Sequence, residues 1–146
     1  MKIHQLSFFL ENKPGQLSEP CRLLAQAGVS IRTLTLADTE EFGILRLIVS
    51  DWEKGERILR EVGYVVNITE VVAVEVPDRP GGLAELLAVF ETTDINIEYM
   101  YAFTFGRGDT AVLIFRFDKP DAAIERLQLA GNIVVGSTEV YHRMGK

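Results

Sequence analysis

Two short turns carry the residue types that could bind a small zwitterion. The sequence ENKPGQL occupies residues 11–17, and the related sequence PDRPGGL occupies residues 77–83. A Pro-Gly pair directly before a helix leaves backbone N–H groups unpaired at the positive end of that helix, and glycine lets an anion approach them closely. Asn12 and Asp78, three residues before Gly15 and Gly81, each add an oxygen that can accept hydrogen bonds from an ammonium group. Together these groups suit a free α-amino acid.

The same residues also have a purely structural interpretation, in which Asn12 and Asp78 brace the turn. Other chemistry has less support. The single cysteine and the two histidines, His4 and His142 at opposite ends of the chain, do not form a metal-binding cluster. No GxSxG motif is present, and the glycines of GRGD (106–109) are not followed by the GK[ST] of a phosphate-binding loop. We therefore expect no catalytic residue, no metal and no cofactor.

The composition is typical of a soluble protein, and we expect it to be cytoplasmic. Of its 146 residues 47% are apolar, and 21 acidic against 15 basic residues give a net charge of −6, which disfavours nucleic-acid partners. The apolar stretch at the amino terminus is too short for a signal peptide, and no run of apolar residues is long enough to cross a membrane. Cys21 has no partner for a disulfide, and we expect a buried core thiol.

The two turns belong to a repeat that covers the chain. Gly15 and Gly81 are 81 − 15 = 66 residues apart, and apolar positions elsewhere match at the same offset. The sequences VVNITEV (65–71) and VVGSTEV (134–140) match again at 134 − 65 = 69 residues, which implies a small insertion. The repeat therefore predicts that the same order of strands and helices occurs twice along the chain.

Each copy begins with an alternating strand and continues through the turn into a helix. Because proline is tolerated only in the first turn, Pro20 predicts that the first helix begins at about Gly15 or Gln16. A capping box of Ser50 and Glu53 and a cap by Asp118 predict where the later helices start. The expected second strands are 29–38 and 95–105, the third strands 43–50 and 110–117, and the last strands 65–71 and 134–140.

This order is βαββαβ twice, which predicts an α+β fold of two tandem ferredoxin-like modules with antiparallel sheets and helices packed on one face. We expect the modules to occupy residues 1–70 and 71–146. Nothing separates them, because residues 65–76 read as one extended strand without a Gly, Pro or Ser run.

The sequences NKPGQL and DRPGGL after first strands, with GVSI and DINI after first helices, resemble the ACT domain, a small regulatory module of amino-acid metabolism. The resemblance covers nearly the whole chain as two copies. In ACT domains that bind serine, the ligand lies at an interface between two modules, where it contacts the turn of one and the start of the second strand of the other. Carried over to this sequence, the resemblance implies turn contacts at Asn12 and Asp78, and further polar contacts at Ser30 and Asn96. The complete candidate site is Asn12, Lys13, Pro14, Gly15, Gln16, Leu17, Ser30, Asp78, Arg79, Pro80, Gly81, Gly82, Leu83 and Asn96.

One departure from the family bears on the ligand. Some of these modules have a histidine two residues before the turn asparagine, where this chain has Leu10 and Val76. The pocket is then more apolar, which favours a branched or aromatic amino acid. The expected protein is a stand-alone, non-catalytic amino-acid-binding regulator, and unpaired sheet edges predict a homodimer.

Two alternatives remain open. One is a module without a ligand that docks onto an enzyme of amino-acid metabolism, with Phe9 and the aromatic strand at 95–105 as candidate contacts. The other is a small enzyme on the same fold, since a fold alone fixes no function.

Overall fold

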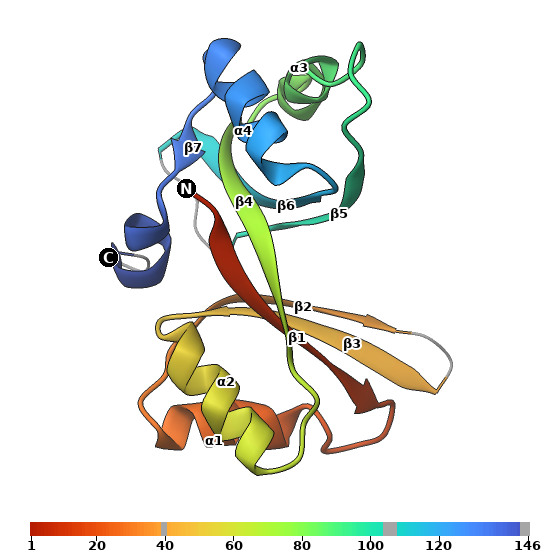
Figure 1. Cartoon of the computed structure of the whole chain (residues 1–146), viewed down its shortest axis with the longest axis vertical. Coiled ribbons are helices and arrows are strands. Elements are labelled where there is room, and N and C mark those ends of the chain that lie inside the picture. Colours follow the sequence, from red (N-terminus) through yellow and green to blue (C-terminus); the bar gives the residue numbers. More distant parts are fainter. Residues whose placement is uncertain (39–40, 104–107, 144–146) are drawn as a thin grey trace. The chain divides into compact units, whose positions relative to one another are not determined.

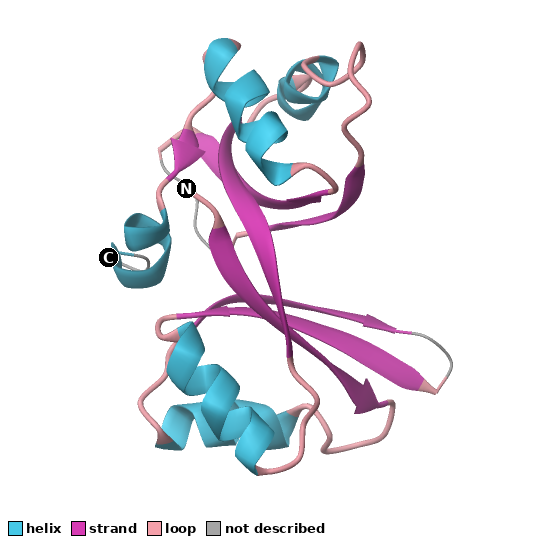
Figure 2. Cartoon of the chain, in the orientation of Figure 1, coloured by secondary structure: helices cyan, strands magenta, loops and turns pink. Residues whose placement is uncertain are grey.

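The computed structural model describes residues 1–38, 41–103 and 108–143. Contacts divide the chain into two compact units, one of His4–Thr69 and one of Met1–Ile3 together with Glu70–Lys146. We call the first unit module one and the second module two. Both follow the expected alternation of strands and helices (Figure 2).

Module one is an antiparallel sheet with two helices on one face (Figure 1). Its elements are β1 (Ile3–Glu11), α1 (Ser18–Gln26), β2 (Ile31–Asp38), β3 (Phe42–Val49) and α2 (Trp52–Glu61). Strand β3 lies between β1 and β2. The alternation of β1 places Leu6, Phe8 and Leu10 in the core, where they join Leu24 of α1 and Leu59 of α2. Burial of each such side chain contributes about 1.5–3 kcal/mol.

Module two repeats this arrangement. Its elements are β4 (Asn67–Pro77), α3 (Gly82–Ala88), β5 (Ile97–Ala102), β6 (Thr110–Phe117), α4 (Pro120–Leu129) and β7 (Val134–Val135), followed by a π-helix at Glu139–Arg143. Strand β6 pairs with β4 and β5, and β7 pairs with β4. Val72, Val74 and Val76 of β4 pack in the core with Leu86 of α3 and Leu127 of α4. The predicted α+β fold of βαββαβ modules is confirmed.

The extended strand expected at 65–76 is present as β4, an unbroken strand of 11 residues that begins at Asn67, two residues later than expected. Its first residues, Asn67–Thr69, belong to module one, and the rest belongs to module two. At the amino terminus, Lys2 forms ion pairs with Glu70 (Nζ to carboxylate oxygen, 3.6 Å) and with Asp121 (3.0 Å). The first three residues therefore contact module two.

Several expected element boundaries were wrong. The strand expected at 134–140 ends at Val135, and Val140 is buried in the π-helix, where its N–H donates to the carbonyl of Gly136 at 3.1 Å. Helix α1 begins at Ser18, two to three residues later than expected, although Pro20 does lie in its first turn. The expected strands at 95–105 and at 110–117 are β5 and β6, and residues 104 and 105 lie outside the described residues.

Two further expectations concern the environment of the chain. We expected Cys21 to be a fully buried core thiol, but its side chain is only half-buried. The buried residues of α1 are Pro20 and Leu24. Across the described parts of the chain, no helix has the length and apolar character needed to span a bilayer.

Candidate functional site

The two turns have the same backbone conformation. Gly15 has φ +84° and Gly81 has φ +85°, values that only glycine adopts without strain, and open space surrounds the position of a Cβ at each. Gly81 directly precedes α3, and Gly15 lies three residues before α1. The repeat is thus a repeat of turn geometry as well as of sequence.

Hydrogen bonds in the first turn leave two backbone amides unpaired. The N–H of Asn12 donates to Glu41 O (2.9 Å), that of Lys13 to Glu11 O (2.9 Å), and that of Gln16 to Lys13 O (3.3 Å). Within the described residues, the N–H groups of Gly15 and Leu17 have no acceptor. Both lie just before α1, where the positive end of the helix favours an anion.

The second turn has a similar hydrogen-bond pattern. Asp78 N–H donates to Asp109 O (2.9 Å), Arg79 N–H to Pro77 O (3.0 Å) and Gly82 N–H to Arg79 O (3.0 Å). The N–H groups of Gly81 and Leu83 have no acceptor in the part of the chain that the structure describes. A Cβ on Gly82 would lie 2.1 Å from the carbonyl oxygen of Pro77, so this position requires glycine.

The side chains of Asn12 and Asp78 are exposed, and neither makes a hydrogen bond to a described residue. Their oxygens therefore do not brace the turns through such a bond. Charged neighbours stabilise the turns instead. Lys13 pairs with Glu11 at 2.8 Å, which raises the Lys13 pKa, and Arg79 forms two hydrogen bonds to Glu85 at 3.1 and 2.8 Å.

A small hollow of about 80 Å³ adjoins the first turn. It is lined by Leu10, Glu11, Asn12, Lys13, Gln16, Leu17, Leu36, Asp38 and Gly43. Gly43 makes room for the side chain of Leu36, because a Cβ there would lie 2.8 Å from Cδ1 of Leu36. Sequence reasoning missed Leu36, Asp38 and Gly43. The pairing of β3 with both neighbours, in which Gly43 lies opposite Leu10 and Asp38, is the signal that could have located them.

Module two differs at the corresponding place. Ala111 lies opposite Val76 in the β4–β6 pairing, as Gly43 lies opposite Leu10 in the β1–β3 pairing. Module two thus has a methyl group at the position where module one has Gly43. The two turns share a backbone, but their surroundings differ.

Ser30 and Asn96 lie at the other end of each sheet from the turns. Ser30 directly precedes β2, whose Ile31 pairs with Val49, whereas Asp38 at the far end of β2 pairs with Gly43 beside the turn. Seven residues of strand span about 23 Å. The structure therefore does not bring Asn12 and Ser30 together within a module.

The backbone amides of Ser30 and Asn96 are occupied. Ser30 N–H donates to Oγ of Ser50 at 2.9 Å, and Asn96 N–H donates to Oδ1 of Asp118 at 2.8 Å. The side chains of Ser50 and Asp118 thus hold the start of a second strand, and neither is the helix cap that we expected. Asp51 caps α2 by accepting from the Lys54 N–H at 3.1 Å, and Lys119 is the N-cap of α4.

Among the described residues, no three His, Cys, Asp or Glu side chains are grouped closely enough to hold a metal ion. The groups at the turns are instead bare amides, carboxylates and an amide side chain. That these groups bind the ends of a zwitterion stays a prediction.

Comparison with known proteins places this geometry in a family. The chain is similar to a protein from Bacteroides thetaiotaomicron of known crystal structure, with 37% identity, a TM-score of 0.90 and coverage of 97% of both chains. It shares the fold of the regulatory subunit of aspartate kinase from Thermus thermophilus, with a TM-score of 0.63 and 16% identity over 88% of this chain and 92% of that one.

A curated relative is the acetolactate synthase small subunit of Buchnera aphidicola subsp. Baizongia pistaciae, which is 31% identical over 78 residues. That match covers 51% of this chain and 49% of the relative, so it spans about half the length of each. The ACT domain pair family matches residues 1–139. ACT modules are regulatory and bind amino acids. With the duplicated βαββαβ order and the duplicated turn, this match shows that the chain belongs to the ACT domain pair family.

Proposed function

We propose that this protein is a non-catalytic regulator that binds a free amino acid at the turns of its ACT modules. The observation that carries the proposal is the first turn, where two unpaired amides and the unengaged side chain of Asn12 adjoin a hollow. Gly15 and Leu17 would donate to the ligand carboxylate, and the Asn12 oxygen would accept from its ammonium group. Asp38 at the rim adds negative charge for the same ammonium group, whereas the charge of Glu11 is paired with Lys13.

The hollow supports a half-site that a second module completes. Its volume of about 80 Å³ is well below the range of about 300 Å³ and more that is usual for enclosed ligand sites. In ACT domains that bind serine the ligand lies between two modules. On the support of this resemblance, we propose that another module supplies the second wall and polar contacts such as those of Ser30 or Asn96. A homodimer provides such modules in symmetric pairs.

The apolar lining supports a branched or aromatic side chain on the ligand. Leu10 is buried at one side of the hollow, and Leu36 is 47% exposed at the other. Covering the exposed Leu36 with a ligand side chain removes apolar surface from water and strengthens binding. A polar ligand such as serine gains nothing from this contact.

Regulation requires that the ligand bind two arrangements of the protein with different affinity. We propose that ligand binding changes how ACT modules pair, and that a cytoplasmic enzyme of amino-acid metabolism responds. The residue ranges 1–70 and 71–146 remain our proposal for the two modules, with the boundary inside β4.

Thermal unfolding of the protein with each proteinogenic amino acid in turn tests the proposal. At a hundredfold excess over its dissociation constant, a ligand adds about 2.7 kcal/mol and raises the midpoint by roughly 5 to 10 °C for a chain of this size. We expect leucine, isoleucine, valine or an aromatic amino acid to give such a shift. An unchanged midpoint with all twenty would contradict the proposal.

Gly15→Ala, with Gly131→Ala as the matched control, locates the site. Both glycines have φ +84° and open space at the Cβ position, so both substitutions carry the same backbone strain of about 1–2 kcal/mol. Only the change at residue 15 places a methyl group where a carboxylate would approach the turn. We expect the ligand-induced shift to be lost in Gly15→Ala and kept in Gly131→Ala.

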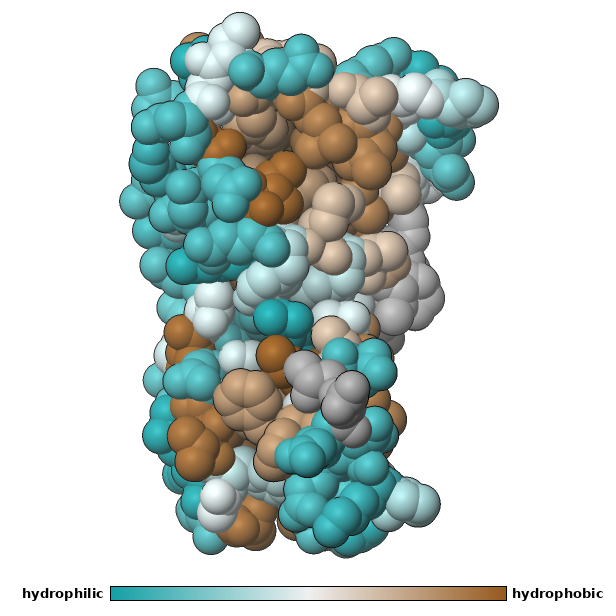
Figure 3. All heavy atoms as spheres, turned by 90° about the vertical axis from the view of Figure 1, so that its right-hand side faces the viewer, coloured by the Kyte–Doolittle hydropathy of each residue, from teal (hydrophilic) through white to brown (hydrophobic). Residues whose placement is uncertain are grey.

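A second candidate is a docking module for an enzyme, and the similarity to an acetolactate synthase small subunit favours it. Module one exposes large apolar side chains that include Phe9 (62%) and Phe42 (46%), and apolar surface is visible on the face drawn in Figure 3. Under this function no amino acid stabilises the protein. A tight complex with a catalytic subunit that Phe9→Ser weakens would support it.

A further inference from the structure

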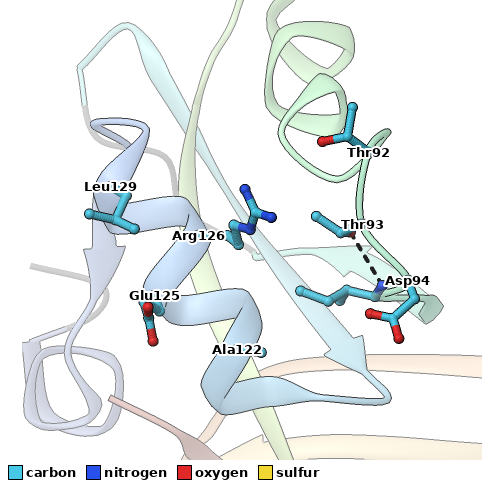
Figure 4. A pocket seen from close by; sticks show the side chains of 8 residues that line it. Thr92, Thr93, Asp94, Ala122, Glu125, Arg126 and Leu129 are labelled. Carbon is cyan, nitrogen blue, oxygen red and sulfur yellow. Dashed lines mark hydrogen bonds between the residues drawn. The ribbon is translucent and has the colours of Figure 1, made fainter.

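Module two contains a cleft that lies apart from both turns. It has a volume of about 640 Å³ and lies between helix α4 and the segment Thr92–Ile95 that leads into β5 (Figure 4). This volume is within the range of about 300–1,000 Å³ that small-molecule sites occupy. None of its lining residues belongs to the candidate site described above.

Comparison of the two modules explains why the cleft is polar. Helices α2 and α4 match at a constant offset, since the N-caps are Asp51 and Lys119 (119 − 51 = 68) and the buried leucines are Leu59 and Leu127 (127 − 59 = 68). At this offset Arg126 takes the place of Ile58 (126 − 58 = 68). Ile58 packs against the core of module one, whereas Arg126 is exposed in the cleft.

The wall opposite α4 is fixed by local bonds. Helix α3 has seven residues where α1 has nine, and the chain continues through turns to β5. The Thr93 hydroxyl donates to Phe90 O at 2.8 Å and accepts from Ile95 N–H at 3.2 Å. Asp94 forms an ion pair with Lys119, the N-cap residue of α4. A wall that is already ordered costs little conformational entropy when a ligand binds.

The cleft holds a guanidinium group that is available for binding. Arg126 extends from α4 toward the segment with Thr92 and Thr93 (Figure 4). Among the described residues, the side chains of Arg126 and Thr92 have no hydrogen-bond or ion-pair partner. By contrast, Arg60, Arg79 and Arg116 are each paired with a glutamate.

We propose that this cleft binds a short aliphatic carboxylic acid, as a second ligand site of the protein. The planar guanidinium of Arg126 matches a carboxylate with two parallel hydrogen bonds, and the Thr92 hydroxyl donates a third. Ala122 and Leu129 of α4 offer apolar contacts to a short hydrocarbon tail. Glu125 also lines the cleft, and its charge opposes a doubly charged phosphate or dicarboxylate more than a singly charged carboxylate. Asp94 lines the cleft as well, but its charge is paired with Lys119.

Nitrogen-15 NMR titration of the full chain with isovalerate tests this proposal. We expect saturable shift changes confined to the amides of residues 92–95 and 122–129 at millimolar concentration. Isovaleramide has the same shape without the charge and should leave these signals unchanged, and inorganic phosphate should do the same. A response to isovaleramide equal to that to isovalerate, or no saturable response up to about 50 mM isovalerate, would overturn the proposal.

Two substitutions test whether Arg126 and Thr92 contact the carboxylate. Arg126→Gln should weaken isovalerate binding about tenfold, and Thr92→Val should weaken it by a smaller factor, because a charged partner makes the stronger hydrogen bonds. Arg57→Gln is the control, since Arg57 is an exposed arginine of α2. Retention of full affinity in Arg126→Gln contradicts the proposal. These signals are independent of the turns, so Gly15→Ala should leave them unchanged.

Discussion

Ser50 accepts a hydrogen bond from the N–H of Ser30 at 2.9 Å and thereby joins the start of β2 to the end of β3. A backbone hydrogen bond joins the same two residues, in which the Ser50 N–H donates to Ser30 O at 2.8 Å. The corresponding pair in module two is Asp118 and Asn96. In both modules, therefore, a side chain just after the third strand accepts a hydrogen bond from the residue that precedes the second strand.

Removing these hydrogen bonds should reduce the free energy of unfolding, whereas removing the side chain of Glu53 should not. Ser50→Ala and Asp118→Ala each delete an acceptor and should lower the free energy of unfolding by about 1 kcal/mol. Asp51→Ala, which removes the actual cap of α2, should cost a similar amount. Glu53→Ala should change stability by less than about 0.5 kcal/mol. Urea unfolding measures all four, and a large effect of Glu53→Ala would restore the capping box.

Gly82→Ala should destabilise the protein strongly. The new Cβ would lie 2.1 Å from the Pro77 carbonyl oxygen, which is backbone and cannot move aside cheaply. We expect a loss of about 3 kcal/mol or more. Gly136→Ala is the control, because no atom lies within 4 Å of its Cβ position, and it should stay within about 0.5 kcal/mol of the original protein. Equal stability of the two variants would show that the second turn relaxes.

Gly43→Ala should weaken ligand binding while the fold is kept. The methyl group comes too close only to Cδ1 of Leu36, the flexible end of a side chain, so the cost to stability should stay below about 1.5 kcal/mol. It also displaces Leu36, which lines the hollow, and it takes the position that Ala111 has in module two. The thermal shift produced by leucine or phenylalanine should therefore shrink, with Gly136→Ala again as the control. An undiminished shift would exclude this hollow from the site.

Tyr64 should make stability depend on pH in the alkaline range. Burial, together with the hydrogen bond that its hydroxyl donates to Glu19 at 2.5 Å, raises the pKa of Tyr64 to about 12. In the unfolded chain the phenol titrates near pH 10, so the folded state retains the proton to higher pH. Its contribution is complete below about pH 10 and is lost as the pH rises from there towards 12.

Tyr64→Phe removes this dependence. The difference in the free energy of unfolding between the original protein and the variant should be constant at neutral pH and should decline between about pH 10 and 12. Ultraviolet titration should show one fewer phenol with a high pKa in the variant. A pKa of Tyr64 near its ordinary value would contradict the contact with Glu19.

The strands and the repeated turns could be predicted from the sequence because their signals are local. Alternation in β1 identified Leu6, Phe8 and Leu10 as core residues, and the proline and glycine of each turn fixed the backbone. Helix starts were less accurate because Ser50 and Asp118 have the composition of caps, while the structure uses them to hold residues 20 and 22 positions earlier in the chain. Such partners are invisible to a local pattern.

The two cavities could not be predicted for a related reason. Gly43 borders the hollow because it pairs with both Leu10 and Asp38, and this pairing depends on the register of three strands. Arg126 looks like an ordinary surface residue of α4 until its helix is aligned with α2. The predicted end of the last strand was wrong because VVGSTEV repeats the composition of VVNITEV, whereas the chain leaves the sheet after Val135.

Strand β4 imposes a parity on any insertion within its second half. Val72, Val74 and Val76 all pack in the core of module two and all have even numbers. Successive side chains of a strand point to opposite faces, so one codon added between residues 72 and 76 would turn the valines that follow it away from this core. Two added codons would keep the three valines on one face. Lengthening within this part of the strand is therefore tolerated in steps of two.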